Sequence, residues 1–490
     1  MRPVLFIHGY GSEREDASQE GIQQIYGGLP ERVRQCPGVG EVHSLNLSRW
    51  ISRDDAVSLD DVGFAMQREL EANFPDLLSR ETGFHIITHS TGALVVRNWL
   101  MRFSPRPSPM RHLIHLAGAH YGSGLAHIGA GQMARWGRKI LDGRDAGLAV
   151  LRELEFGASE TIDMHLFFQE GHDLYKAYHV REFCICGSQI PGRSFQLAPI
   201  RYVKEDASDC TVRTSAANAN LRYFKVSPLE GAGRITTDEL LTIVDTAENQ
   251  QDIPLDEVHY GITERIIPGE GDREEVPFGI PFETAHIGDT KGILYGEQSK
   301  GDVLPFLYRA LQTHETNAAS YRKTARLFRE WTEETETRAK ELDGSLLEWD
   351  AQKQYEAHAQ LIIRIQDQDG RPVKGFDVFM HSVEQTGGFK LEKRIETKHV
   401  NRFHAGTITF YLRTKEFSEG EFVDCLADLA DLNVQIFGTE SKTRDVAYVP
   451  VSVRLTGDAL RDFIHHHQTT IVDVQLLRVP TRNVFQAVEL

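Results

Sequence analysis

Cysteine is scarce in this chain, with five residues among 490 at uneven spacings. Two of them, Cys184 and Cys186, alternate within an apolar stretch, which places both on one face of a predicted strand. That position favours packing in a core over a disulfide or a metal site. So few cysteines do not make a disulfide framework, and we expect a protein that works in a reducing compartment.

Long hydrophobic runs are missing as well. No stretch approaches 18 consecutive apolar residues, so we expect no transmembrane helix. Near the amino terminus only Val4–Ile7 is apolar, which is too short for the hydrophobic region of a signal peptide. We expect a protein without a signal peptide, either cytoplasmic or peripherally associated with a membrane, with export by a non-classical route as the alternative.

Basic residues are outnumbered by acidic ones, which gives a formal net charge of −17. This charge disfavours nonspecific binding to nucleic acid and electrostatic capture by an anionic membrane. Any contact with lipid would therefore depend on local apolar surface. Apolar residues make up 40% of the chain and charged residues 26%, which is typical of a soluble globular protein, and the length predicts two or three domains.

The stretch Gly83–Phe103 is the most informative part of the sequence. A short apolar run ends abruptly at Thr88-His89-Ser90-Thr91-Gly92, and an apolar-rich helical pattern follows. A strand, a sharp turn with a serine at its tip and a helix form the nucleophile elbow of serine hydrolases. Gly92 meets the need for a small residue, but Thr88 stands where the general G-x-S-x-G pattern has glycine. The alternative is a plain buried strand followed by a helix.

A second motif lies at the amino terminus, where the predicted strand Pro3–Ile7 runs into His8-Gly9-Tyr10. The glycine would let the backbone turn so that the N–H of Tyr10 points at the serine. Together with the N–H of Thr91 it would form an oxyanion hole. The alternative is an ordinary glycine turn at a strand end, but the order and spacing of the two motifs favour the hydrolase interpretation.

The acid and the base are expected after later strands of the same sheet, in the chain order serine, acid, histidine. Asp209 follows the predicted strand Arg181–Gly187 and is the candidate acid, with Asp206 as the runner-up. After Arg222–Val226, the predicted last strand, His259 stands in a loop and is the candidate base. His89 adjoins the serine and is sterically a poor base. Four other histidines remain as alternatives: His85, His172, His179 and His286.

The remaining pattern divides the chain into two domains. Residues 119–180 form an insertion with helical patterns at 134–141 and 147–154, which we interpret as a cap over the site, with a plain packing insertion as the alternative. Residues 272–292 resemble a surface excursion, and helices are predicted at 302–312 and 318–347. We expect a catalytic α/β domain over 1–350.

Over 351–490 the pattern changes to alternating strands with turn signals, which predicts a β-sandwich. The predicted strands are 361–365, 376–381, 406–412, 446–455 and 470–479. No catalytic constellation is visible there. The run His465-His466-His467 does not indicate a metal site, because consecutive side chains point apart. We expect no metal and no cofactor.

The elbow, the loop from Ser208 to Asn218 and the segment His259-Tyr260-Gly261-Ile262 together resemble the PlaB-like family of bacterial phospholipases A and lysophospholipases. That family has a THSTG elbow, which accounts for Thr88. The resemblance implies an α/β-hydrolase domain followed by a β-rich domain, and the roles of nucleophile, acid and base for Ser90, Asp209 and His259. Cys210 stands where the family pattern leads us to expect glycine.

The resemblance also implies the activity and the partners. These are phospholipid and lysophospholipid substrates, peripheral membrane contact and self-association into a homo-oligomer. Other interpretations of the site are a carboxylesterase, or an acyltransferase in which an alcohol replaces water. A non-catalytic scaffold with a lipid- or protein-binding β-sandwich is a further alternative.

Overall fold

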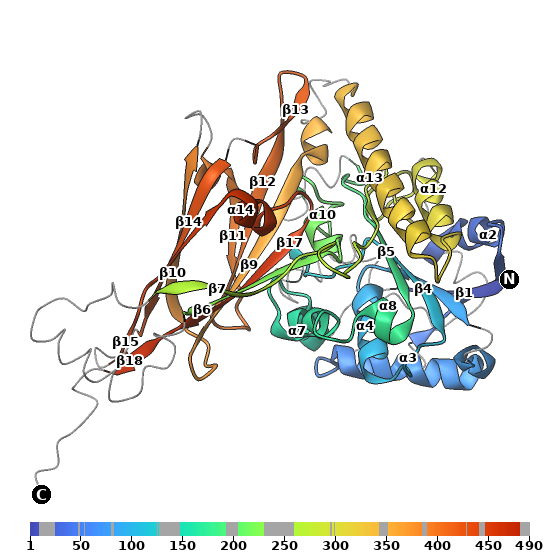
Figure 1. The fold of residues 1–490 in the computed structure, drawn as a ribbon. Helices are drawn as coiled ribbons and strands as arrows, with labels where there is room; N and C mark the ends of the chain where they lie inside the picture. Colours follow the sequence, from blue (N-terminus) through green and yellow to red (C-terminus); the bar gives the residue numbers. More distant parts are fainter. Residues whose placement is uncertain are drawn as a thin grey trace, which may run out of the picture. The chain divides into compact units, whose positions relative to one another are not determined.

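The structure is a computed structural model that divides the chain into two compact units (Figure 1). Unit 1 comprises residues 1–220, 268–358 and 416–423, and unit 2 comprises 221–267, 359–415 and 424–490. The residues that the structure describes are 1–8, 25–47, 50–52, 54–79, 83–124, 126, 148–192, 204–229, 259–294, 296–297, 299–342, 351–384, 390–427, 429–440 and 446–480.

Unit 1 is built on a six-stranded sheet with the order β2-β1-β3-β4-β5-β8, in which every neighbouring pair is parallel. Parallel sheets are covered on both faces, so their strands are apolar runs, and all six residues of β3 are buried. The strands are β1 (Arg2–Ile7), β2 (Val39–Ser44), β3 (Phe84–His89), β4 (Met110–Leu116), β5 (Arg181–Ile185) and β8 (Phe278–Gly279).

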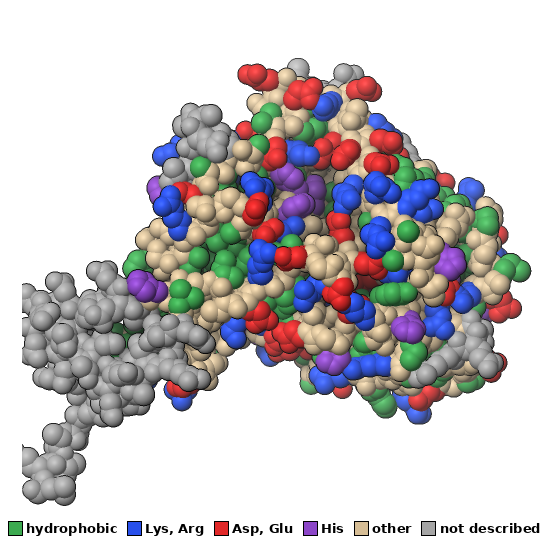
Figure 2. All heavy atoms as spheres, in the orientation of Figure 1, with side chains coloured by type: hydrophobic (Ala, Val, Ile, Leu, Met, Phe, Trp, Pro, Cys, Tyr) green, Lys and Arg blue, Asp and Glu red, His purple; other side chains and the backbone are tan. Residues whose placement is uncertain are grey.

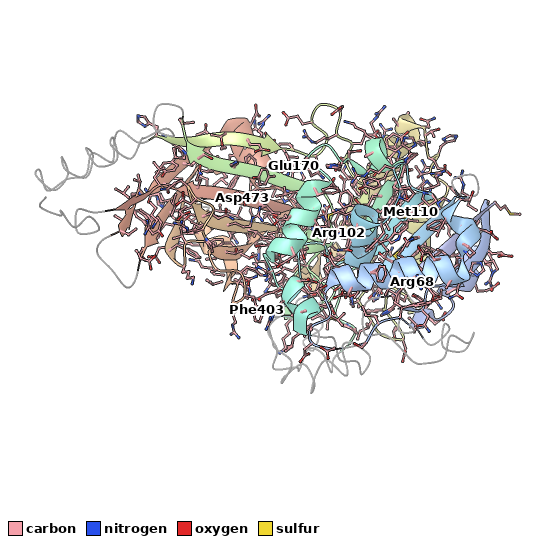
Figure 3. The ribbon with its side chains drawn as sticks, turned by 90° about the horizontal axis from the view of Figure 1, so that it is seen from below. Arg68, Arg102, Met110, Glu170, Phe403 and Asp473 are labelled. Carbon is pink, nitrogen blue, oxygen red and sulfur yellow. The ribbon has the colours of Figure 1, made fainter. Side chains whose placement is uncertain are left out.

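Helices cover both faces of this sheet. α3 (Leu59–Asn73) and α4 (Gly92–Arg102) lie on one face, and α12 (Lys300–Leu311) and α13 (Ala318–Lys340) lie on the other (Figure 1). Figure 3 looks onto the first of these faces, with Arg68 of α3 and Arg102 of α4 labelled. The shorter helices are α2 (Leu29–Arg34), η2 (Pro75–Leu78), α6 (Leu148–Glu153), α7 (Ser159–Phe167), α8 (Leu174–Tyr178), α10 (Thr214–Ala217) and η6 (Ala351–Tyr355).

The predicted cap falls between β4 and β5 and comprises α6, α7 and α8 in the part that the structure describes. Helix α7 packs against α4, and α6 corresponds to the predicted helix at 147–154. The predicted helix at 134–141 lies outside the described residues.

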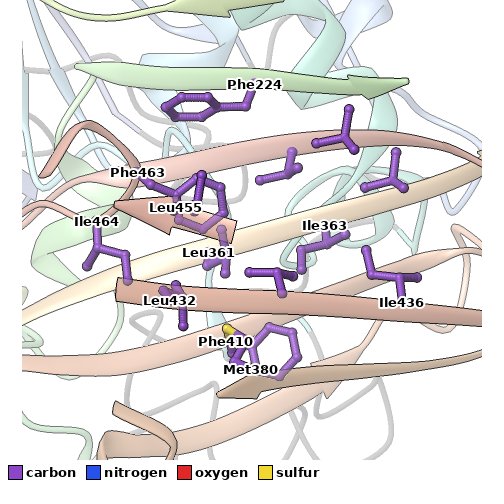
Figure 4. Close-up of a cluster of buried hydrophobic side chains, with 14 of the residues drawn as sticks. Phe224, Leu361, Ile363, Met380, Phe410, Leu432, Ile436, Leu455, Phe463 and Ile464 are labelled. Carbon is purple, nitrogen blue, oxygen red and sulfur yellow. The ribbon is translucent and has the colours of Figure 1, made fainter. Parts of the chain in front are cut away.

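Unit 2 is a β-sandwich. One sheet has the order β10-β14-β16, and the other has the order β11-β12-β9-β17-β6-β7 with β13 paired to β12. Buried side chains of both sheets, among them Leu361, Phe410, Leu432 and Leu455, form one hydrophobic core (Figure 4). A small pair, β15 and β18, completes the unit.

The strands of these sheets are β6 (Leu221–Pro228), β7 (Tyr260–Ile266), β9 (Ala357–Asp367), β10 (Gly375–Glu384), β11 (Ile395–Val400), β12 (Thr407–Ser418), β13 (Glu421–Asp424), β14 (Leu429–Thr439), β15 (Val446–Tyr448), β16 (Val451–Thr456), β17 (Thr469–Leu476) and β18 (Arg478–Pro480). Residues 357–358 and 416–423, which include the start of β9, the end of β12 and most of β13, are counted with unit 1. The helices of unit 2 are η7 (Leu391–Arg394) and α14 (Gly457–Phe463).

The structure confirms the α/β domain and the β-sandwich but differs in the strand at 222–226. This segment, β6, pairs in parallel with β17 and so belongs to the sandwich, not to the sheet of unit 1. The last strand of that sheet is β8, within the segment predicted as a surface excursion. A two-residue strand gives no periodic pattern, and the pairing partner of β6 lies some 250 residues further along the chain.

Candidate active site

The predicted elbow is present between β3 and α4. Ser90 adopts a φ of 54°, in the left-handed region that is unfavourable for residues other than glycine. Its N–H donates to the carbonyl of Leu116 at 3.1 Å, which ties the turn to the end of β4. The Ser90 residue retains 8% exposure. A serine is thus held in a strained turn at the carboxyl edge of the sheet, as nucleophilic serines are in this fold.

Gly92 allows the close approach that this turn requires. A Cβ atom at this position would lie 2.9 Å from the carbonyl oxygen of Ile7 at the end of β1. Thr91, the residue before α4, begins the helical backbone with φ −57° and ψ −24°. Its N–H lies at a helix amino terminus, where the helix dipole favours a negative charge. Tyr10, predicted as the second oxyanion donor, lies outside the described residues.

Asp209 occupies a buried loop that follows β5 in chain order, and its side chain is fully enclosed. Its Oδ1 accepts hydrogen bonds from the N–H groups of Thr211 at 3.0 Å and Val212 at 2.7 Å. Its Oδ2 lies 2.8 Å from Nδ1 of His286. Asp206, the runner-up, instead accepts a hydrogen bond from the side chain of Gln354 at 3.1 Å.

Cys210 follows the acid with a φ of 78°, which L-residues rarely adopt. The turn that presents the Asp209 carboxylate therefore needs a left-handed residue at this position, and glycine would adopt that conformation without strain. The left-handed conformation explains why the family resemblance leads us to expect glycine here. In this chain a buried cysteine adopts that conformation.

His286 lies in the loop after β8 and is 2% exposed. Its backbone N–H donates to the carbonyl of Asp209 at 3.0 Å, while the loop before it is held by a bond from Gln189 N–H to the carbonyl of Thr284 at 2.9 Å. Because a carboxylate only accepts, the Nδ1 atom of His286 donates to Asp209 and the Nε2 atom is the one left to exchange a proton.

A row of three histidine rings, tilted against one another, connects His286 to the elbow. The ring of His89 lies 4.6 Å from the ring of His286 and 4.8 Å from the ring of His8, centroid to centroid. Nδ1 of His89 lies 3.2 Å from Nε2 of His8. Burial, followed by the neighbouring rings of His286 and His8, holds the pKa of His89 well below its usual range. His89 is therefore neutral. Because His89 is the residue before Ser90, its ring contact with His286 brings the His286 imidazole next to the elbow.

His259 and Asp209 belong to different units of the structure. His259 is exposed, stands immediately before β7 in unit 2, and its carbonyl accepts a hydrogen bond from the N–H of Leu229 at 2.8 Å. The imidazole in contact with the Asp209 carboxylate belongs to His286, which the sequence offered only as an alternative. The sequence signal for His286 is weak, because the strand that precedes this histidine, β8, has only two residues.

The other alternative histidines have local structural contacts. His85 lies on β3 against the ring of His112, and burial, then Arg2 and Arg111, lower its pKa to about 3. His172 stacks on Phe167 with a centroid distance of 4.1 Å. His179 ends α8 in a left-handed conformation with φ 60°.

In the described part of the chain, no group of three or more histidine, cysteine, aspartate or glutamate side chains is arranged to hold a metal ion. His466 contacts the side chains of Thr414 and Asp424. None of the helices in these residues has the length and apolar character needed to cross a bilayer.

The comparisons with known proteins agree with this architecture. The profile of the palmitoyl protein thioesterase family matches residues 3–145, while no curated protein sequence is significantly similar. Two solved structures of phospholipase PlaB from Legionella pneumophila, one in complex with thio-NAD, match with a TM-score of 0.76. They are 20% and 21% identical in sequence, and the match covers 100% of this chain and 96% of each of theirs. The resemblance predicted from the motifs is confirmed as a shared fold, and the chain has the fold of PlaB over its full length.

Proposed function

We propose that this protein is a serine hydrolase that releases fatty acids from phospholipids and lysophospholipids, with Ser90 as nucleophile, His286 as base and Asp209 as acid. The observation that supports this most is the buried Asp209–His286 pair, whose imidazole packs against the ring of His89, the residue before a serine in a strained strand-to-helix turn. In this proposal His286 takes the role that the motifs predicted for His259.

The reaction follows from these groups. Ser90 Oγ attacks the ester carbonyl carbon while its proton moves to Nε2 of His286, and Asp209 stabilises the imidazolium that forms. The Thr91 N–H, with that of Tyr10 as the predicted second donor, stabilises the oxyanion. The proton then passes to the leaving alcohol and an acyl-enzyme remains. Water, deprotonated by His286, attacks the acyl carbon and releases the fatty acid and free Ser90.

Two similarities to known proteins support the proposed substrate class. One neighbour is named a phospholipase, and the matching profile is named a palmitoyl protein thioesterase. Hydrolysis of a fatty acyl group is common to both names, so we propose a long acyl chain bound near Ser90. The profile match favours a second candidate, a fatty acyl thioester, for which the same acyl-enzyme would form with a thiol as the leaving group.

Peripheral membrane contact and self-association remain proposals from the family resemblance. Lys and Arg side chains are interspersed with Asp and Glu on the face of unit 1 shown in Figure 2. Contact with lipid would therefore depend on apolar side chains. In unit 2, Phe379 and Phe437 are 55% and 39% exposed and pack edge to face. Flotation with phosphatidylcholine vesicles tests the first proposal and light scattering tests the second.

The proposed function is tested with Ser90→Ala. We expect loss of fatty-acid release from phosphatidylcholine and lysophosphatidylcholine, with an unchanged melting temperature, and loss of labelling by a fluorophosphonate. Palmitoyl-CoA in parallel separates the thioester candidate, and the ratio of free to transferred acyl product separates an acyltransferase. A variant that still hydrolysed at the wild-type rate would refute the proposal, and a wild-type protein that resisted labelling would favour the scaffold.

A further inference from the structure

Thr88 stands where the general elbow motif has glycine, and the structure gives its side chain a partner. Thr88 is fully buried at the end of β3, and its Oγ1 lies 2.8 Å from Nδ1 of His115 on the adjacent strand β4. The other ring nitrogen of His115 lies 2.8 Å from Oε1 of Glu182 on β5. These three side chains join three neighbouring strands in one line of hydrogen bonds.

The same carboxylate holds the helix that follows the nucleophile. Arg97 of α4 donates from Nε to Oε1 of Glu182 at 2.8 Å and from Nη2 to Oε2 at 2.7 Å. Both side chains are 2% exposed. Such a bidentate pair is geometrically specific, and breaking one half of it would leave an uncompensated buried charge.

The protons in this chain of contacts can be assigned. Burial raises the pKa of Glu182, but the charge of Arg97 and the contact with His115 outweigh burial and hold it below its usual value. Glu182 is thus an acceptor, and Nε2 of His115 donates to it. Burial lowers the pKa of His115 and keeps the ring neutral, so its Nδ1 is an acceptor. The hydroxyl of Thr88 therefore donates to His115.

Two of the residues that make these contacts lie on either side of the nucleophile in the sequence. Thr88 precedes Ser90 by two residues and reaches Glu182 through His115. Arg97 follows Ser90 on α4 and binds Glu182 directly. We propose that Thr88, His115, Glu182 and Arg97 form a buried clamp that holds the strained turn at Ser90, and that Thr88 is a positioning residue for the nucleophile. The inference rests on the proposed function, because it assigns a role around the same serine.

The clamp accounts for a threonine in place of glycine. In the general motif the strand can approach the helix closely because no side chain intervenes. Here the Thr88 side chain is present, and its hydroxyl hydrogen-bonds Nδ1 of His115. The other ring nitrogen of His115, Nε2, contacts Glu182. Removing the hydroxyl would leave Nδ1 of a buried imidazole without a donor and free the strand end to shift.

The test is Thr88→Val, which has the same branched shape but no hydroxyl, measured beside Thr88→Ser, which keeps the donor. We expect Thr88→Val to lower kcat about 10- to 100-fold with KM nearly unchanged, since small misplacements of a nucleophile have effects of that size. Fluorophosphonate labelling should slow by a similar factor, and Thr88→Ser should restore both.

Thr313→Val is the matched control. Thr313 is also buried in unit 1, and its hydroxyl bonds the carbonyl of Arg309 at 2.8 Å and Oγ1 of Thr324 at 2.7 Å, away from the elbow. We expect it to lower the melting temperature while kcat and labelling at 25 °C stay at the wild-type level. A purely structural role for Thr88 would give the same pattern in Thr88→Val and would overturn the proposal.

Two further results separate the possible failures. If Thr88→Val does not fold, Thr88→Ala, which also lacks the hydroxyl and is smaller, replaces it, and a wild-type kcat in that variant overturns the clamp. If Ser90→Ala is inactive and Thr88→Val retains the wild-type kcat, the proposed function stands and only the clamp fails. If Ser90→Ala is active, the proposed function itself fails.

Discussion

Asp209 and His286 are joined twice, through side chains and through backbone. Oδ2 of Asp209 lies 2.8 Å from Nδ1 of His286, and the N–H of His286 donates to the carbonyl of Asp209 at 3.0 Å. The second bond fixes the two loops relative to each other, so the imidazole is held in place by more than its own side-chain contact. A loop after β5 and a loop after β8 are thereby held at the carboxyl edge of one parallel sheet, where active sites of such sheets form.

The first prediction separates the two candidate bases. His286→Ala should lower kcat for fatty-acid release by about 10⁴-fold or more, because no other group would accept the serine proton. His259→Ala should stay within about twofold of the wild type, since His259 is exposed in unit 2 and surface substitutions are nearly neutral. Steady-state kinetics of both variants checks this. The opposite ranking would restore His259 as the base.

The second prediction concerns the turn that presents the acid. Cys210→Gly should keep wild-type activity and change the free energy of unfolding by no more than about 1 kcal/mol, since lost packing of the thiol offsets relief of the left-handed strain. Cys210→Val should destabilise the protein by about 1–3 kcal/mol and lower kcat, because a β-branched residue disfavours a φ of 78°. Chemical denaturation and kinetics report both. A valine variant as stable as the glycine variant would contradict the argument.

The elbow could be predicted from sequence because its chemistry and its local geometry coincide in one short stretch. Ser90 and Gly92 are close in sequence, and the strand and helix around them are local patterns that need no knowledge of distant contacts. Asp209, the candidate acid, was assigned from its place after a clear apolar strand. The β-sandwich could be predicted from alternation, although the predicted strands did not include β7, β11, β13 and β14.

His286 could not be chosen over His259 by the same reasoning. The prediction depended on finding the last strand of the sheet, and the apolar segment β6 matched the expected pattern better than the two-residue β8. Whether β6 joins one sheet or another depends on its pairing with β17, a contact between distant segments that local periodicity does not encode. Which histidine contacts Asp209 therefore depends on tertiary pairing, which the sequence pattern does not show.

The third prediction concerns the close approach at the start of α4. Gly92→Ala should reduce both stability and activity, because its Cβ would lie 2.9 Å from the carbonyl oxygen of Ile7 and the backbone would have to shift. Gly301→Ala, in α12, is the matched control, since nothing lies within 4 Å of a Cβ there. The control should be stabilised by up to about 1 kcal/mol. Melting temperatures and fluorophosphonate labelling of both variants decide the point, and equal behaviour would argue against a steric requirement.

The last prediction concerns the pH dependence of stability through Glu153, at the end of α6. Its Oε2 accepts the N–H of Leu59 at the start of α3 at 2.8 Å. Burial, with Glu160, Asp60 and Asp61 nearby, raises its pKa to about 7, against the effect of the Leu59 bond. Between pH 4.5 and about 7 the Glu153 carboxyl is protonated in the folded protein but ionised in the unfolded chain. The free energy of unfolding therefore falls as the pH rises through this range. The stability that depends on Glu153 is complete below about pH 4.5 and is lost by about pH 7. Glu153→Gln keeps an acceptor for Leu59 without the charge, and it should raise the melting temperature more at pH 8 than at pH 5. A difference between variant and wild type that stayed constant across that range would show that Glu153 does not titrate there.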